Sequence, residues 1–233
     1  MALQRKIATI VKRIPVISSI LRSIYSKIRS TVQFESSGDY WEERYASSGD
    51  SGDGSYGRLA KFKAEVINSF VGENSINTVI EFGCGDGAQL KLMEYPSYVG
   101  VDVSNTIIDK CSRKFEDDAG KKFVTLDGYA HKDKQYDLSL SLDVIYHLIE
   151  DEVYEAYMHN LFGSSKKWVI VYSSDTVKQA PYVHVKHRKF TEWVKKNKED
   201  WEFSHKVDQR YPISEGENGQ TSFADFFFFR RKD

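Results

Sequence analysis

The chain has 233 residues, of which 40% are hydrophobic and 29% charged, and its formal net charge is -1. This length fits one catalytic domain with an appendage. No apolar run reaches about 18 residues, no N-terminal apolar segment ends in a cleavage site, and Cys84 and Cys111 are the only cysteines. These features argue against secretion, a membrane span and a disulfide framework, so we expect a cytoplasmic protein.

Residues 1–34 form a basic segment with seven Lys or Arg and no acid, which leaves 26 basic and 34 acidic residues beyond it. Its apolar residues recur at alternating spacings of four and three, typical of one side of a helix; they are Leu3, Ile7, Ile10, Ile14, Ile17, Leu21, Ile24 and Ile28. Pro15 favours two shorter helices. Such a segment suits an anionic membrane surface, and contact through residues 1–30 would place the chain at the inner membrane face. Packing on the domain or on another subunit is the alternative.

Residues 35–57 are rich in Ser, Gly, Asp and aromatic side chains, and the run at 47–57 reads SSGDSGDGSYG. That run contains too many helix breakers for a regular element. The segment is predicted to be a linker or a lid. The aromatic and basic side chains just before this run favour a lid that closes over a bound ligand; they are Tyr40, Trp41, Arg44 and Tyr45. Arg44 and Tyr45 are expected to contact that ligand. An aromatic cluster can equally dock on the core.

Helices and strands alternate through residues 58–233, which predicts an α/β domain with a mostly parallel sheet and right-handed crossovers. The expected strands are 78–82, 98–103, 122–126, 136–143 and 168–173, and the expected helices are 59–70, 106–115, 151–161 and 190–196, with a short helical stretch after residue 87. The last two strands, 201–211 and 221–231, follow each other directly. They predict a terminal antiparallel hairpin and a total of seven strands.

A glycine-rich turn ends the first of these strands, with the sequence EFGCGDG at residues 81–87. Alternating glycines let the backbone turn sharply and approach a nucleotide-like ligand. Asp102 ends the second strand, 21 residues after Glu81, where a carboxylate meets the ribose hydroxyls of an adenosine ligand. Asp127 ends the third strand and can reach an adenine edge.

These residues resemble the class I S-adenosylmethionine-dependent methyltransferases. EFGCGDG is similar to the E-x-G-x-G-x-G of their first motif, and VGVDVS at 99–104 is similar to the second. The resemblance covers about residues 58–231 and implies a Rossmann-like fold with S-adenosylmethionine as cofactor. The residues that it places at the cofactor are Glu81, Gly83, Cys84, Gly85, Gly87, Asp102, Val103, Asp127 and Asp143. The segments FGCGDGxQL and SGxGSYGRLAxFK further resemble bacterial methyltransferases of sugar or surface-polysaccharide pathways.

Two other classes of function remain open. The sequence GCGDGA at 83–88 also satisfies the looser G-x-G-x-x-A fingerprint of NAD(P)-dependent oxidoreductases. Such enzymes usually need a second mononucleotide-binding half, and the terminal hairpin occupies that part of this chain. A non-catalytic protein that binds the nucleoside ligand is the third reading.

Candidate catalytic residues follow the fourth and fifth strands. The sequence DVIYH at 143–147 lies at the ligand-binding edge, where His147 can take a proton from an acceptor hydroxyl, with Asp143 beside it. His187 is a second candidate base. The segment 181–190, PYVHVKHRKF, adds His184, Lys186 and Arg188, which would suit an anionic acceptor unless they form a solvated helix start.

The combined prediction is direct in-line transfer of a methyl group to an oxygen of a sugar or another small hydroxyl-bearing acceptor. A small-molecule N-methyltransferase is the nearest alternative. Asp143 and His147 alone make a poor metal site, so no metal is expected. Nucleic acid is a poor partner because the part beyond residue 34 is net negative and has no basic stripe interleaved with aromatic residues.

Overall fold

A computed structural model describes residues 36–129, 135–178, 183–213 and 220–232. The expected N-terminal helices of residues 1–34 lie outside the described residues, as do Pro181 and Tyr182 of the basic segment. Within the described ranges, no helix is both long enough and apolar enough to span a bilayer.

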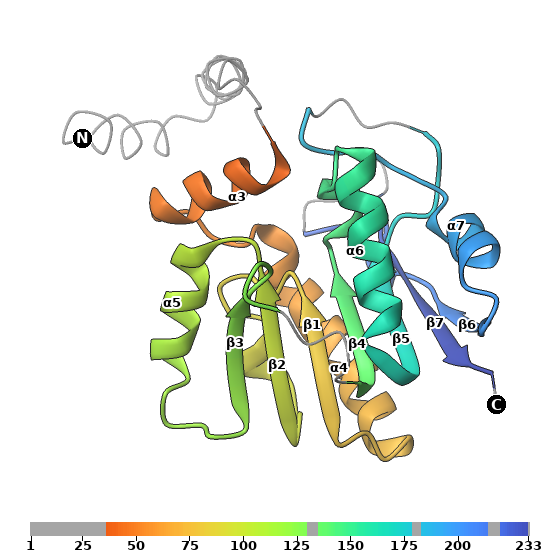
Figure 1. Cartoon of the computed structure of the whole chain (residues 1–233), viewed down its shortest axis with the longest axis horizontal. Coiled ribbons are helices and arrows are strands. Elements are labelled where there is room, and N and C mark those ends of the chain that lie inside the picture. The colour runs from red at the N-terminus through yellow and green to blue at the C-terminus, as the bar shows by residue number, and fades with distance from the viewer. Residues whose placement is uncertain (1–35, 130–134, 179–182, 214–219, 233) are drawn as a thin grey trace. The chain divides into compact units, whose positions relative to one another are not determined.

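Seven strands form one sheet in the order β3-β2-β1-β4-β5-β7-β6 (Figure 1). Their bounds are β1 Thr78–Phe82, β2 Ser97–Asp102, β3 Lys121–Thr125, β4 Tyr136–Leu142, β5 Ser165–Ser173, β6 Trp201–Val207 and β7 Asp225–Arg231. The strands β1 to β5 are parallel, whereas β7 runs antiparallel to both β5 and β6. The Rossmann-like sheet with a terminal hairpin is therefore confirmed. Both hairpin strands are shorter than predicted, since β6 ends at Val207 and β7 begins at Asp225.

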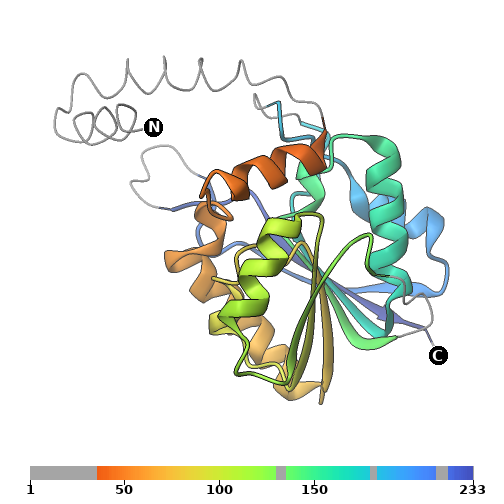
Figure 2. The ribbon, with the colours of Figure 1, turned by 60° about the vertical axis from the view of Figure 1, so that its left-hand side comes forward.

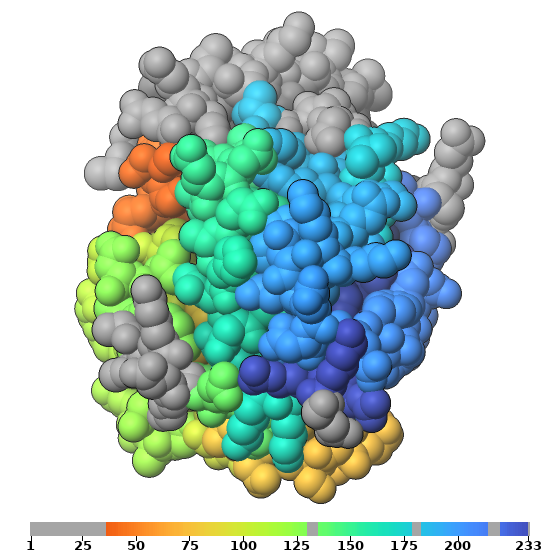
Figure 3. All heavy atoms as spheres, turned by 45° about the vertical axis from the view of Figure 1, so that its right-hand side comes forward, coloured from red at the N-terminus to blue at the C-terminus, as the bar shows by residue number. Residues whose placement is uncertain are grey.

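Helices cover both faces of the sheet. They are α4 Gly57–Glu73, α5 Asn105–Lys114, α6 Asp151–Gly163 and α7 Phe190–Asn197. One core cluster joins α4 and α5 to one sheet face, and the other joins α6 and α7 to the opposite face. Figure 2 shows α4 and α5 from the side, and Figure 3 shows α6 and α7 side by side on the surface of their face. Only a 3-10 turn, η2 Leu90–Leu92, follows the glycine-rich loop.

The run of four phenylalanines in β7 is explained by its place between β5 and β6. Phe226 and Phe228 belong to the cluster with α4, whereas Phe227 and Phe229 belong to the cluster with α6 and α7. Successive strand residues point to opposite faces, so a strand covered on both sides needs a continuous apolar run.

The segment expected to be an irregular linker or lid contains a helix, α3 Ser37–Ala46. The hydroxyl of Ser36 caps this helix by accepting from the backbone N–H of Asp39 at 3.1 Å. The breaker-rich run that follows contains only the 3-10 turn η1, Asp53–Ser55. In Figures 1 and 2, α3 lies above the edge of the sheet where β1, β2 and β4 end.

Candidate active site

The carboxyl ends of β1, β2 and β4 open into a cavity of ≈ 340 Å³. That volume lies in the range of small-molecule sites. The floor is built by the strand ends and the loops that follow them, and the roof by α3 and the loop at 47–56. Parallel strands bring their carboxyl ends to one edge, so Glu81, Asp102 and Asp143 meet here although they are far apart in sequence.

The glycine-rich loop turns through positive φ angles at Gly83 (81°), Gly85 (56°) and Gly87 (67°). A Cβ atom at Gly83 would collide with Val144, and one at Gly85 would collide with the Ser51 hydroxyl. Only glycine fits both the conformation and the space. Gly83 and Gly85 line the cavity, whereas Gly87 faces α5, where a Cβ would come within 2.6 Å of Phe115.

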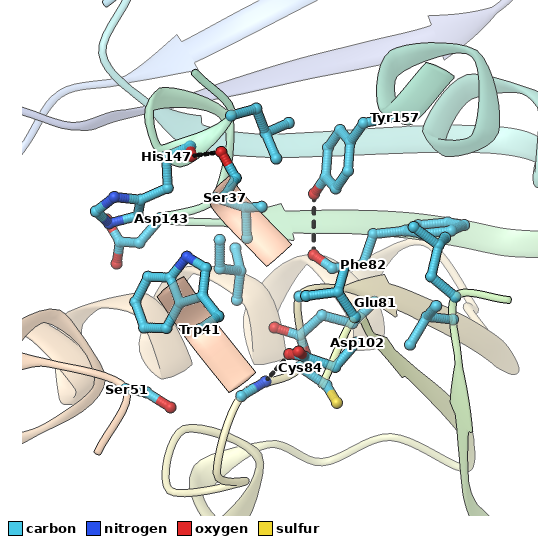
Figure 4. Close-up of a pocket in the computed structure, with 18 of the residues that line it drawn as sticks. Ser37, Trp41, Ser51, Glu81, Phe82, Cys84, Asp102, Asp143, His147 and Tyr157 are labelled. Carbon is cyan, nitrogen blue, oxygen red and sulfur yellow. Dashed lines mark hydrogen bonds between the residues drawn. The ribbon is translucent and has the colours of Figure 1, made fainter. Parts of the chain in front are cut away.

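Two buried carboxyls lie side by side at the ends of β1 and β2 (Figure 4). Burial raises the pKa of Glu81 to about 7, although the Tyr98 hydroxyl donates to it at 2.6 Å. Burial also raises the pKa of Asp102 to about 6, against the lowering effect of the Ser104 and Gly85 backbone N–H groups at 3.1 and 3.0 Å. The cavity therefore holds poorly solvated negative charge that a cationic ligand would stabilise.

The roof helix α3 is bonded to the protein at both ends. At its start, Ser37 binds Glu150 through its backbone N–H at 2.7 Å and its hydroxyl at 2.5 Å. At its end, the backbone carbonyl of Tyr45 accepts from Lys110 at 2.6 Å, and Glu42 accepts from the backbone N–H and hydroxyl of Thr106. Trp41 lies between these ends and faces the cavity (Figure 4).

The loop at 47–56 closes onto the glycine-rich loop through Asp86. The Ser51 backbone N–H donates to the Asp86 carboxylate at 3.1 Å, and the Ser51 hydroxyl accepts from the Asp86 backbone N–H at 2.8 Å. The Tyr56 hydroxyl also donates to Asp86. Burial would raise the pKa of Asp86, but the hydrogen bond from Tyr56, with those from Ala88 and Ser51, lowers it overall.

The far side of the cavity is built by Asp143 and the 3-10 turn η3, Ile145–His147. One oxygen of Asp143 accepts from Lys63 at 2.6 Å, and the other accepts from the Tyr146 hydroxyl at 2.7 Å. The Nδ1 atom of His147 lies 2.9 Å from the backbone carbonyl of His184, so Nδ1 carries the hydrogen and Nε2 keeps its lone pair. Burial lowers the pKa of His147 to about 4, so the imidazole is neutral at pH 7 but is a weaker base than expected.

Comparison with known proteins adds a family match and a set of similar folds. Residues 79–167 match the family model described as a methyltransferase domain. No curated protein matches the chain. The methyltransferase domain of bacterial CtHen1 is 19% identical, with a TM-score of 0.57 over 76% of this chain and 100% of that one. This is a class I methyltransferase fold.

Two further solved structures with this fold were crystallised with S-adenosylhomocysteine. Magnesium protoporphyrin IX methyltransferase from Synechocystis PCC 6803 is 18% identical, with a TM-score of 0.55 over 88% of this chain and 100% of that one. The N-methyltransferase NodS from Bradyrhizobium japonicum WM9 is 14% identical, with a TM-score of 0.57 over 76% of this chain and 87% of that one. These structures, each under 20% identical to the chain, share its fold, and their activities differ: one is a magnesium protoporphyrin IX methyltransferase and the other an N-methyltransferase. Both bind S-adenosylhomocysteine, the demethylated product of the cofactor that the sequence predicts.

The structure brings most of the predicted site residues to one cavity. The predicted residues that line it are Tyr45, Glu81, Gly83, Cys84, Gly85, Asp102, Val103, Asp143 and His147. Of the others, Gly87 packs on α5, Asp127 is exposed, and Arg44 binds Asp50 at 3.0 Å. His187 is buried away from the cavity lining, with its Nδ1 2.6 Å from the Ser174 hydroxyl. Lys186 and Arg188 bind Asp151 at 2.6 and 2.8 Å, so their charges already have a partner.

Sequence analysis missed four residues that also line the cavity, Lys63, Glu150, Ser37 and Gln89. The sequence could have identified Lys63, because it lies four residues from both Leu59 and Ile67, in the middle of the apolar stripe of the expected helix. A lysine on such a stripe needs a buried partner. Glu150 and Ser37 left no signal, because their contact joins segments 113 residues apart.

Proposed function

We propose that this chain transfers the methyl group of S-adenosylmethionine to an oxygen of a sugar or another small hydroxyl-bearing acceptor. The observation that carries the proposal is the acid-rich cavity between the glycine-rich loop and α3. The cofactor, when bound, supplies an electrophilic methyl group on a positively charged sulfonium. A cavity with several carboxylates and one Lys fits such a cation.

The residues that would hold the cofactor follow from their chemistry and place. Gly83 and Gly85 allow close approach of the backbone, and Asp102 offers carboxylate oxygens to ribose hydroxyls. Val103 and Leu126 supply apolar surface for a purine at the ends of β2 and β3. The roof formed by α3 excludes water from the reacting groups.

The acceptor belongs on the side of Asp143 and His147, because the glycine-rich loop takes the cofactor. His147 Nε2 has a free lone pair and can accept the proton that an acceptor hydroxyl loses. A pKa of about 4 means that the imidazole would hold that proton briefly and pass it to solvent. Alignment of the two reactants within the cavity would therefore supply much of the acceleration.

Calorimetric titration of the purified chain with S-adenosylhomocysteine, NAD and NADP tests the cofactor assignment. We expect binding of the first ligand alone, weakened by roughly tenfold or more in Asp102→Ala, because two buried hydrogen bonds to a charged group are lost. Binding of NAD or NADP instead would reject the proposal. Methyl transfer from labelled S-adenosylmethionine to nucleotide sugars, compared with amines, then separates O- from N-methylation.

We also propose that the protein works in the reducing cytoplasm, with residues 1–30 at the anionic inner membrane surface. Cys84 and Cys111 are both free and buried, as a reducing compartment permits. The seven basic residues and the apolar stripe of the N-terminal segment support the membrane contact.

A further inference from the structure

Lys63 is a buried cation inside the cavity. It belongs to α4, has a relative exposure of 1%, and is the only Lys or Arg among the described residues that line the cavity. Its ammonium lies 2.6 Å from an Asp143 carboxylate oxygen and 5.1 Å from the centre of the Tyr172 ring. A lysine this deeply buried is held by its partner carboxylate and not by solvent.

Asp143 is fixed in place by several constraints. It has a φ of 61°, a left-handed conformation that is unusual for a non-glycine residue. Each of its carboxylate oxygens has a donor, Lys63 on one side and the Tyr146 hydroxyl on the other. The roof loop also lies close, since a Cβ on Gly54 would come within 2.8 Å of the Asp143 carboxylate. Such strained residues cluster at ligand-binding sites.

The charge of the cavity depends on this pair. Its lining carries four carboxyl groups, Glu81, Asp102, Asp143 and Glu150, against the single ammonium of Lys63. The cofactor of the proposed function carries a sulfonium charge before methyl transfer, and the product is a neutral thioether. The two ligands differ at the sulfur by one methyl group and one positive charge. The net charge of the lining therefore sets their relative affinity.

We propose that Lys63 is a specificity-determining residue that limits the preference of the cavity for the sulfonium cofactor over its thioether product. By neutralising Asp143, Lys63 keeps the cavity from binding the cationic ground state too tightly. This matters because the charge at sulfur disappears as the methyl group leaves, and tight binding of a charge that is lost in the reaction raises the barrier. The inference rests on the proposed function.

The test is calorimetric titration of the full chain with S-adenosylmethionine and with S-adenosylhomocysteine. The measured quantity is the ratio of the two dissociation constants, thioether over sulfonium. In Lys63→Met the ratio should rise roughly tenfold, because Asp143 is no longer neutralised. In Asp143→Asn it should fall by about the same factor, because Lys63 is then unpaired.

Two further variants complete the design. The double variant Lys63→Met with Asp143→Asn removes both charges, so its ratio should stay within about twofold of wild type. It also leaves no unpaired buried charge, which keeps the test informative where Lys63→Met fails to fold. Lys61→Met is the matched control, because Lys61 is exposed on the same helix and its loss should leave the ratio unchanged.

Three results have different meanings. An equal loss of affinity for both ligands in Lys63→Met, with an unchanged ratio, would overturn the inference and assign Lys63 to a ligand group that both share, such as the carboxylate. An unchanged ratio in Asp143→Asn, or a ratio in the double variant that departs from wild type by roughly tenfold, would overturn it too. Failure of the wild-type chain to bind either ligand would instead reject the proposed function.

Discussion

Glu81 and Asp102 titrate in the physiological range because they are buried, with pKa values of about 7 and about 6. Both values lie above those of the unfolded chain, so folding favours the protonated carboxyls. The stability that these groups contribute is therefore fully present below about pH 4 and is lost as the pH rises through about 6 and 7. Binding of a cation has the opposite dependence, because it needs the carboxylates ionised.

Because ionised Asp102 lowers stability but favours cation binding, Asp102→Asn should change the pH dependence of both. Without ligand at pH 8, the variant should be more stable than wild type by on the order of 2 to 3 kcal/mol, because a buried charge is removed. At pH 4 the difference should largely vanish. Urea unfolding at a series of pH values measures it. A pH-independent difference would show that the carboxyl is not the titrating group.

The same variant should lose the pH dependence of ligand affinity. In wild type, affinity for S-adenosylmethionine should rise between pH 5 and 8 as Asp102 and Glu81 ionise. In Asp102→Asn the rise should be smaller and follow Glu81 alone. Calorimetry across this range supplies the comparison.

The residues that sequence analysis identified are those whose role is local. Gly83, Gly85 and Asp102 follow from a short motif and its place at strand ends, so their convergence was predictable. Lys63 was not identified, because its partner Asp143 lies 80 residues away. His187 was assigned to the site, but it lies outside the cavity lining and its Nδ1 contacts Ser174. The position of a residue after a strand in the sequence does not specify whether its side chain reaches the cavity.

At the scale of elements, α3 lines the roof of the cavity and is held there by hydrogen bonds at its start. The hydroxyl of Ser37 donates to Glu150 at 2.5 Å, lies 2.9 Å from the His147 carbonyl oxygen, and accepts from the Ile149 backbone N–H. These bonds tie the start of α3 to the loop between η3 and α6. Because α3 roofs part of the cavity, we expect these bonds to slow the exchange of a ligand.

Ser37→Ala removes this attachment at one point. We expect S-adenosylhomocysteine to dissociate about tenfold faster, because a part-buried carboxylate loses a hydrogen bond and opening of α3 becomes easier. Stopped-flow displacement of the ligand measures the rate. Ser47→Ala is the matched control, since the Ser47 hydroxyl donates to the Arg44 carbonyl at the other end of the helix. Equal rates in both variants would show that α3 does not limit exchange.

The whole fold was predictable to a greater extent than the site. The alternation of helices and strands predicted the parallel sheet, and two consecutive strands predicted the hairpin. The four consecutive phenylalanines of β7 explain why it lies between two other strands, because a strand that is apolar on both faces belongs inside the sheet. The presence of α3 was not predicted, since its sequence SGDYWEERYA has little apolar periodicity and depends on contacts with distant segments.

The charge distribution of the whole molecule leads to the last prediction. Residues 1–34 carry seven positive charges, whereas the remainder carries a net charge of -8. Residues 36–233 form a compact unit by themselves. Seven basic residues near an anionic surface contribute about 1 kcal/mol each, and the apolar stripe adds burial in the interface. The acidic remainder would be repelled by the same surface, so binding should depend on the N-terminal segment alone.

Sedimentation with vesicles tests this dependence. The full chain should bind vesicles rich in phosphatidylserine and be released as salt rises from about 0.1 M to about 0.5 M, because the shorter Debye length screens the attraction. A chain that lacks residues 1–34 should stay in solution with the same vesicles while it still binds S-adenosylhomocysteine. Vesicles of phosphatidylcholine alone serve as the neutral control. Equal binding by the full and shortened chains would reject the membrane role, and loss of a dimer on shortening would assign the apolar stripe to a second subunit.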